Sequence, residues 1–351
     1  MEFFVDYGLF LAKVVTILVA IVALIIVIKS ASASGHGGSK GNLEVTNLTE
    51  NYKETVSQLE NHLFDEAVLK ARQKEKKKQD KAEAKAKKKA AKEADTESLE
   101  RKARLFVLDF KGSIDAREVT ALREEVSAIL AVAQKDDEVL VRLESGGGMV
   151  HGYGLASSQL DRLSKAGVKL TVAVDKVAAS GGYMMACVAD KILAAPFAIV
   201  GSIGVIAQLP NFNKLLKKHD IEFEQHTAGE FKRTLTMFGE NGDKAREKFQ
   251  EELEETHVLF KSFVNEHRPD LDIAKVATGE HWFGRQAVDL GLIDEITTSD
   301  DYLTAACKDR EVLHLHYAQK KKLAEKLAGA AGEASDSLLL KWIGRGQRPI
   351  L

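Results

Sequence analysis

Residues 169–189 read KLTVAVDKVAASGGYMMACVA, and this stretch decides the fold class. Its first seven residues are rich in Val and Leu, which predicts a buried strand. Small residues and two glycines follow, and Tyr183 to Ala189 then form an apolar run that predicts a helix. A strand that passes through a tight turn into a helix is part of a βαβ unit, the repeating unit of α/β domains.

Two similar apolar runs lie upstream. Residues 104–110 (RLFVLDF) and 138–144 (EVLVRLE) predict strands. Apolar residues between them recur at helical spacing, and Asp115 with Glu118 three positions later predicts a capping box at the start of that helix. We therefore expect an α/β domain of repeated βαβ units over residues 101–300.

A glycine run, Gly146 to Gly148, follows the second predicted strand and Ser145. Such a run lets the backbone approach another group closely and frees N–H groups to donate. A dinucleotide-binding loop would need glycine at the sixth position, where His151 stands, and a phosphate-binding loop would need Gly-Lys-Ser or Gly-Lys-Thr. An oxyanion hole, a strand for substrate pairing and a simple tight turn remain open.

Ser180 lies between the third predicted strand and its helix. In that position its hydroxyl is exposed, and the helix N-terminus presents N–H donors and a positive dipole end to a developing oxyanion. The position suits a nucleophile, and it equally suits an ordinary helix N-cap.

A serine nucleophile needs a base. His151 is near the glycine run, but no obvious carboxylate would orient it. Lys232 lies between Phe231 and an apolar run at 235–238, which would desolvate it. Lowering the pKa of an amine from about 10.4 to 7 or 8 takes roughly three units at about 1.36 kcal/mol each, which an apolar pocket can supply. Without partners Lys232 would be an ordinary surface lysine.

The N-terminal residues 1–29 predict a transmembrane anchor. Residues 7–28 are almost wholly apolar and match a hydrocarbon core about 30 Å thick. A cleaved signal peptide is the alternative, because residues 31–33 form a small-x-small site. Glu2 and Asp6 stand where a signal peptide has basic residues, which favours the uncleaved anchor.

Residues 30–100 predict a flexible spacer and a basic helical arm. From Leu48 onward apolar residues form one helical stripe that would pair with a partner helix. Between Lys70 and Lys92 there are twelve Lys or Arg against three acids, which favours a solvated spacer, with anionic lipid headgroups as an alternative partner. Nucleic acid is disfavoured, because no aromatic residues for base stacking interrupt the basic run.

The remaining segments and the composition set further bounds. Residues 244–267 predict a long helix, and residues 301–351 predict an edge strand at 312–317 followed by an amphipathic tail. The formal net charge of −2 gives no reason to expect nucleic acid as a partner. With only two cysteines, Cys187 and Cys307, a disulfide framework and structural zinc are excluded, and Cys187 is expected in the core.

Five ordered motifs over residues 105–296 resemble the signal peptide peptidase A family, whose fold is similar to the ClpP and crotonase superfamily. Within the family, the anchor followed by a basic arm resembles a proteobacterial inner-membrane branch. The motifs are Glu144–Gly148, Ala179–Tyr183, Gly201–Val205, Phe231–Arg233, and Gly284–Ala287 together with Gly291–Asp294.

The resemblance implies roles for particular residues. Ser180 would attack the scissile carbonyl, and Lys232, as a neutral amine, would take its proton. Ser202 would orient the lysine. Backbone N–H groups of Gly181 and of one glycine in the pair Gly147–Gly148, with Gly148 the first choice, would hold the oxyanion. No metal or organic cofactor is implied.

The resemblance further implies a serine endopeptidase that hydrolyses membrane-derived, signal or unfolded peptides. It implies a homo-oligomer that encloses its active sites, and a single-pass protein of the bacterial inner membrane that contacts lipid through residues 7–28. A periplasmic catalytic domain is implied too, although the charges beside the anchor leave the side open. Gly146 replaces the proline common in the family, which affects loop rigidity. A catalytically silent scaffold and a crotonase-like acyl-CoA enzyme are the rivals.

Overall fold

The computed structural model divides the chain into two compact units, residues 43–317 and the two termini 1–42 and 318–351 together. No helix among the described residues is long and apolar enough to cross a membrane. The predicted span at 7–28 lies outside them except for residues 11 and 13–16, which are helical. The structure describes residues 11, 13–16, 41–65, 68–70, 74, 78 and 102–318.

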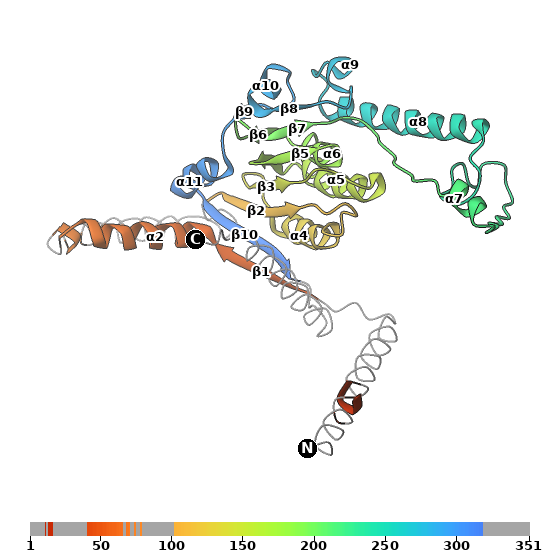
Figure 1. The fold of residues 1–351 in the computed structure, drawn as a ribbon. Coiled ribbons are helices and arrows are strands. Elements are labelled where there is room, and N and C mark those ends of the chain that lie inside the picture. The colour runs from red at the N-terminus through yellow and green to blue at the C-terminus, as the bar shows by residue number, and fades with distance from the viewer. Residues whose placement is uncertain are drawn as a thin grey trace, which may run out of the picture. The chain divides into compact units, whose positions relative to one another are not determined.

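The unit 43–317 has a mixed α/β fold built on a largely parallel sheet (Figure 1). The three predicted strands are found as β2 (Arg104–Lys111), β3 (Glu138–Glu144) and β4 (Lys169–Val174). They pair in parallel, and β6 (Lys191–Ala194) extends the sheet beyond β4. The continuous Val- and Leu-rich sequences of these strands reflect burial on both faces, as is usual in parallel sheets.

The C-terminal strand departs from the prediction. Residues 312–317 were expected at a sheet edge, but β10 (Glu311–Ala318) lies between β2 and β1 (Asn42–Asn47). Its alternating pattern therefore does not mark an edge, because the N-terminal strand β1 covers its outer side. At the opposite end of the sheet, β9 (Glu295–Ile296) pairs with β6.

Helices cover the sheet on both faces, and Figure 1 shows α11 (Ser299–Asp309) across the strands from α4 (Val119–Val132) and α5 (Val150–Lys165). Alternate side chains of β2 explain this arrangement. Phe106 and Leu108 belong to the cluster that α4 and α5 bury, whereas Leu105 and Val107 belong to the cluster that contacts α11. Each fully buried side chain of this size contributes about 1.5–3 kcal/mol of transfer free energy.

The first helix after β2 starts differently from the prediction. Glu118 occupies the N-cap of α4 but makes no side-chain cap. Its carboxylate instead accepts from the N–H and the hydroxyl of Ser113, at 3.1 and 2.8 Å. The predicted capping box between Asp115 and Glu118 is therefore wrong, because the acid closes the turn before the helix.

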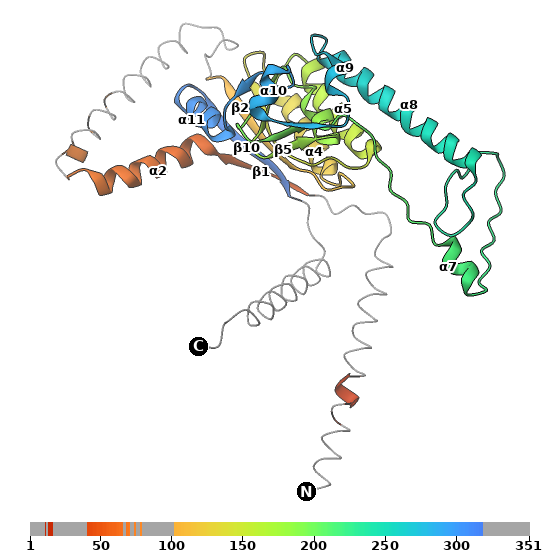
Figure 2. The ribbon, with the colours of Figure 1, turned by 45° about the horizontal axis from the view of Figure 1, so that its top comes forward.

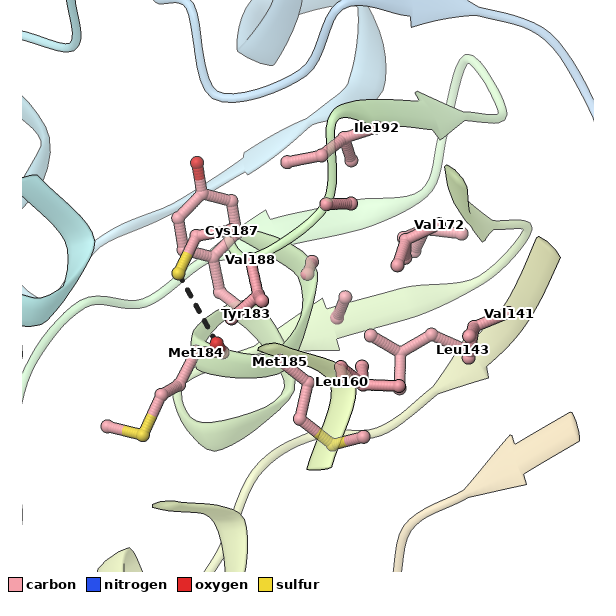
Figure 3. Close-up of a cluster of buried hydrophobic side chains, with 14 of the residues drawn as sticks. Val141, Leu143, Leu160, Val172, Tyr183, Met184, Met185, Cys187, Val188 and Ile192 are labelled. Atoms are coloured by element: carbon pink, nitrogen blue, oxygen red, sulfur yellow. Dashed lines mark hydrogen bonds between the residues drawn. The ribbon is translucent and has the colours of Figure 1, made fainter. Parts of the chain in front are cut away.

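A short helix, α6 (Gly181–Ala186), begins directly after the strand β5 (Val177–Ala179). Every residue of α6 is buried, and Figure 3 shows Tyr183, Met184 and Met185 among side chains from several strands and helices. Cys187 is fully buried and burial raises its pKa, so the prediction of a core cysteine is confirmed. This packing fixes the start of α6.

A small second sheet contains β5, β7 and β8 in that order. The strand β7 (Ile199–Gly201) pairs with β5 in parallel and with β8 (His281–Phe283) in antiparallel orientation. Residues 205–242 between β7 and the long helix α8 (Asp243–His267), here called the α7 segment, contain only the short helix α7 (Asn213–Lys218). In Figures 1 and 2, α7 lies near the start of α8, away from the strands.

The other helices of this unit are peripheral. The predicted helix after residue 48 is found as α2, and most of its apolar stripe is exposed. The two shorter helices, α9 and α10, follow α8, and α10 contacts β7 and β8 of the second sheet. The bounds of the three peripheral helices are Leu48–Leu63 for α2, Ile273–Val276 for α9 and Gly284–Asp289 for α10.

Candidate active site

Ser180 occupies the junction between β5 and α6 in a left-handed conformation, with φ 52° and ψ −119°. Its N–H donates to the carbonyl of Gly201 at 2.8 Å, which holds the junction to the neighbouring strand. Left-handed backbone costs a non-glycine residue about 1–3 kcal/mol and persists only where the surroundings enforce it. Such strain is concentrated at functional sites in proteins.

The Ser180 side chain does not cap the helix. Its hydroxyl makes no cap hydrogen bond to α6 and has no hydrogen-bond partner within the described part of the chain. The side chain is half-buried. The ordinary N-cap alternative is therefore wrong, and the hydroxyl is left available for another group.

The glycine loop lies directly against this junction. Gly147 has φ +87°, and a Cβ there would lie 2.8 Å from the Ser180 Cβ and 2.8 Å from the Gly181 nitrogen. A Cβ at Gly148 would lie 2.1 Å from the carbonyl oxygen of Ile114. Side chains are therefore excluded at both glycines, and two segments more than thirty residues apart in the sequence meet.

The two segments place free N–H donors beside Ser180. The first backbone bond of α6 runs from the Met184 N–H to the Ser180 carbonyl at 2.9 Å, so the Gly181 N–H belongs to the unbonded first turn. The Gly147 N–H is already engaged, because it donates to the Ser145 hydroxyl at 3.1 Å. Within the described residues the Gly148 N–H has no partner, which leaves it available for an oxyanion.

Ser202 lies beside Ser180 because Gly201, which precedes it, pairs with Ala179. It too is left-handed, with φ 51°. Its N–H donates to the Glu280 carbonyl at 2.7 Å, whereas its hydroxyl reaches the Gly279 carbonyl only at 3.4 Å. Two serines therefore end adjacent parallel strands, and the Ser202 hydroxyl is only weakly engaged.

Lys232 is not part of this cluster. It is exposed in the α7 segment and lines a cavity of about 790 Å³ whose walls all come from residues 209–238. The predicted desolvation of Lys232 by its apolar neighbours is not found in the single chain, since Phe231 and Phe238 are themselves 42% and 41% exposed. The rival base, His151, is also exposed, at the start of α5.

The contacts of the α7 segment explain this position. Phe231 faces the start of α8, with the Lys244 and Lys248 amines 5.6 and 5.7 Å from its ring centre, and Glu230 pairs with Lys244. Among the described residues no hydrogen bond or ion pair joins the α7 segment to the strands. The segment is therefore held by itself and by α8.

Sequence reasoning missed Tyr153, a fully buried residue of α5 whose hydroxyl lies 2.5 Å from that of Ser145. Its hydroxyl contacts Ser145, directly before the glycine run, and its ring lies against Gly181 of α6. The available signal was weak, since an isolated tyrosine in a helix is usually a core residue.

Comparison with known proteins assigns the family. Residues 2–160 match the model described as peptidase family S49 N-terminal, and residues 162–313 match peptidase family S49. A probable protease SohB from Haemophilus influenzae is 54% identical over 346 residues, covering 98% of each chain. Another from Buchnera aphidicola is 52% identical over 343 residues, covering 97% of this chain and 98% of the relative. A solved structure of a membrane-bound stomatin-specific protease mutant with a substrate peptide aligns with a TM-score of 0.42 and 12% identity, over 66% of this chain and 99% of that one. The chain belongs to peptidase family S49.

Proposed function

We propose that this protein is a serine endopeptidase in which Ser180 forms the acyl-enzyme and Lys232 is the general base. Membership in a peptidase family, with close relatives named as probable proteases, supports peptide-bond hydrolysis. The observation that carries the finer proposal is the unbonded Ser180 hydroxyl at a left-handed strand–helix junction, next to the glycine loop. This arrangement supplies a nucleophile and oxyanion donors together.

The reaction proceeds by two acyl transfers. The Ser180 oxygen attacks the peptide carbonyl while the neutral Lys232 amine takes its proton, and the N–H groups of Gly181 and Gly148 receive the oxyanion. The C–N bond breaks as the lysine returns the proton to the leaving amine. Water, activated by the same lysine, then attacks the ester and releases Ser180. Ser202 orients the lysine.

Lys232 reaches the Ser180 of a neighbouring subunit on assembly. In the single chain it is exposed and its segment has no hydrogen bond or ion pair to the strands within the described residues. The same segment exposes several large apolar side chains, which a second copy of the domain would cover. Burial in that interface would disfavour the charged ammonium and favour the neutral amine that a general base requires. These exposed side chains are Leu209, Phe212, Leu215, Ile221, Phe223, Phe231, Met237 and Phe238.

The proposal includes a single-pass anchor at residues 7–28 in the bacterial inner membrane, with a periplasmic domain of ClpP/crotonase-like fold. The apolar sequence of 7–28 and the family resemblance support it. The substrates are membrane-derived, signal or unfolded peptides, which an enclosed homo-oligomer admits while excluding folded proteins. A reporter enzyme fused after Leu351 that is active only outside the cytoplasm would support the orientation, and activity only inside would contradict it.

A fluorophosphonate probe tests the nucleophile. It forms a covalent bond with an activated serine, so we expect wild-type protein to be labelled and Ser180→Ala to remain unlabelled. Equal labelling of Ser180→Ala would assign the reaction to another serine. Absence of labelling in both would favour a silent scaffold or an acyl-CoA enzyme.

A further inference from the structure

A chain of three hydrogen bonds, one buried and two partly buried, lies beside Gly147. The Tyr153 hydroxyl donates to the Ser113 carbonyl at 2.9 Å and lies 2.5 Å from the Ser145 hydroxyl. The Gly147 N–H donates to the same Ser145 oxygen at 3.1 Å. Because the Tyr153 proton points to Ser113, Ser145 must donate to Tyr153 and accept from Gly147.

Glycines surround these hydroxyls and the Tyr153 ring, because a side chain at their positions would clash with them. A Cβ at Gly112 would lie 2.3 Å from the Tyr153 oxygen and 2.7 Å from the Ser145 oxygen. A Cβ at Gly181 would lie 2.5 Å from the Tyr153 ring. The Tyr153 ring therefore packs under the first residue of α6, while its hydroxyl reaches the glycine loop through Ser145.

Ser145 is also hydrogen-bonded to β5, the strand that ends directly before Ser180. Its N–H donates to the Val177 carbonyl at 2.9 Å, and its carbonyl accepts from the Ala179 N–H at 3.0 Å. A Cβ at Gly182 would lie 2.6 Å from that carbonyl. Ser145 thus holds the glycine loop and the nucleophile strand in one fixed arrangement.

We propose that Tyr153 and Ser145 are positioning residues that aim the Gly148 N–H at the oxyanion. This inference rests on the proposed function of Ser180. Glycine has wide conformational freedom, so Gly147 needs an anchor if the next peptide plane is to keep one direction. Ser145 supplies that anchor, and Tyr153 fixes the Ser145 hydroxyl. Oxyanion stabilisation depends on donors being held in place before the reaction.

The test compares Tyr153→Phe with Tyr183→Phe in full-length detergent-solubilised protein. Both tyrosines are fully buried, but the Tyr183 hydroxyl donates to the Leu292 carbonyl, away from the glycine loop. For a quenched fluorescent peptide cleaved by the wild type, we expect Tyr153→Phe to lower kcat ~10-fold with little change in KM, less than the ~10²–10³-fold effect of deleting a donor. Tyr183→Phe should keep kcat.

A transition-state mimic gives an independent reading. A peptide aldehyde forms a hemiacetal with Ser180 whose oxygen takes the oxyanion position, so its affinity should fall by the same factor as kcat in Tyr153→Phe. Ser145→Ala should reproduce both losses, and the double variant should be no worse than either single one, because all act through one chain of bonds. A thermal unfolding scan reports the stability change separately.

Two results would overturn the inference alone: wild-type kcat in both Tyr153→Phe and Ser145→Ala, or an equal loss of kcat in Tyr183→Phe. Tyr153 would then be an ordinary core residue. Turnover of the peptide by Ser180→Ala at the wild-type rate would overturn the proposed function and this inference together. The two failures are therefore distinguishable.

Discussion

The two halves of the proposed catalytic site differ in how they are held. The half around Ser180 lies at the ends of buried strands, with left-handed residues and glycines in close contact. The half that carries Lys232 is an exposed segment whose contacts are internal or with the start of α8. The difference indicates that one chain already holds the proposed nucleophile and oxyanion donors in place, while the position of the proposed base depends on what the α7 segment packs against.

The largest expected effect comes from Lys232→Ala. Loss of a general base lowers the rate ~10²–10⁴-fold. Because the Lys232 side chain makes no hydrogen bond or ion pair within the described residues, we expect the thermal midpoint of the variant to stay at the wild-type value. Lys214→Ala, an exposed lysine of the same segment, is the control and should retain activity. Wild-type turnover by Lys232→Ala, measured with the same peptide, would refute the assigned base.

Within the glycine run, substitution of Gly147 should lower activity more strongly than substitution of Gly146. Gly147→Ala forces a Cβ into 2.8 Å contacts and a left-handed backbone at φ +87°, so we expect kcat to fall ~10²-fold and stability to fall by about 1–2 kcal/mol. Gly146→Ala is the matched control, since nothing lies within 4 Å of its Cβ position. Equal kcat values for the two variants would contradict the proposed oxyanion hole.

The stability of the half around Ser180, which is built on the buried strands, should depend on Glu138. This buried carboxylate accepts from Thr171 at 2.7 Å, from Tyr302 at 2.5 Å and from Arg310. We expect Glu138→Gln to lower the free energy of unfolding by about 1.5–3 kcal/mol, because it removes charge-assisted hydrogen bonds from a buried position and leaves the partly exposed Arg310 without its partner. In the α7 segment, Glu240→Gln removes an exposed pair with Lys217 and should cause no measurable change in a urea titration. Similar losses of unfolding free energy in Glu138→Gln and Glu240→Gln would contradict the proposed difference between the two halves of the site.

The smallest effect concerns pH. Burial raises the pKa of Asp109, but the His314 ring 3.1 Å away and the hydrogen-bonded Arg142 guanidinium outweigh burial and lower the pKa to about 2. A lowered folded-state pKa contributes stability above the unfolded value of about 3.9, and this contribution is lost as pH falls toward 2. The stability difference between wild type and Asp109→Asn should therefore shrink on acidification. If urea unfolding gave the same stability difference between wild type and Asp109→Asn at every pH, the lowered pKa of Asp109 would be contradicted.

Local sequence predicted the strand-built half well. The runs at 104–110 and 138–144 are continuous and apolar, so period and composition identified β2 and β3 to within one residue. The junction at Ser180 followed from a strand, small residues and a helix in order. The long helix predicted at 244–267 was likewise found as α8.

Long-range geometry was not predictable in the same way. The local sequence of Lys232 indicated an apolar environment, but its burial depends on which surface the α7 segment packs against. The capping box failed because Glu118 bonds to Ser113, a partner outside the pattern. The position of β10 depended on β1, more than 250 residues away. The predicted span and most of the basic arm lie outside the described residues.

Subunit complementation tests the central claim most directly. Ser180→Ala and Lys232→Ala chains, each inactive alone, would be co-expressed with different tags and the mixed oligomer purified through both. If Lys232 reaches Ser180 of another subunit, the mixed oligomer contains sites with both wild-type residues and turns over the peptide. A mixed oligomer that is assembled but as inactive as either parent would contradict the account.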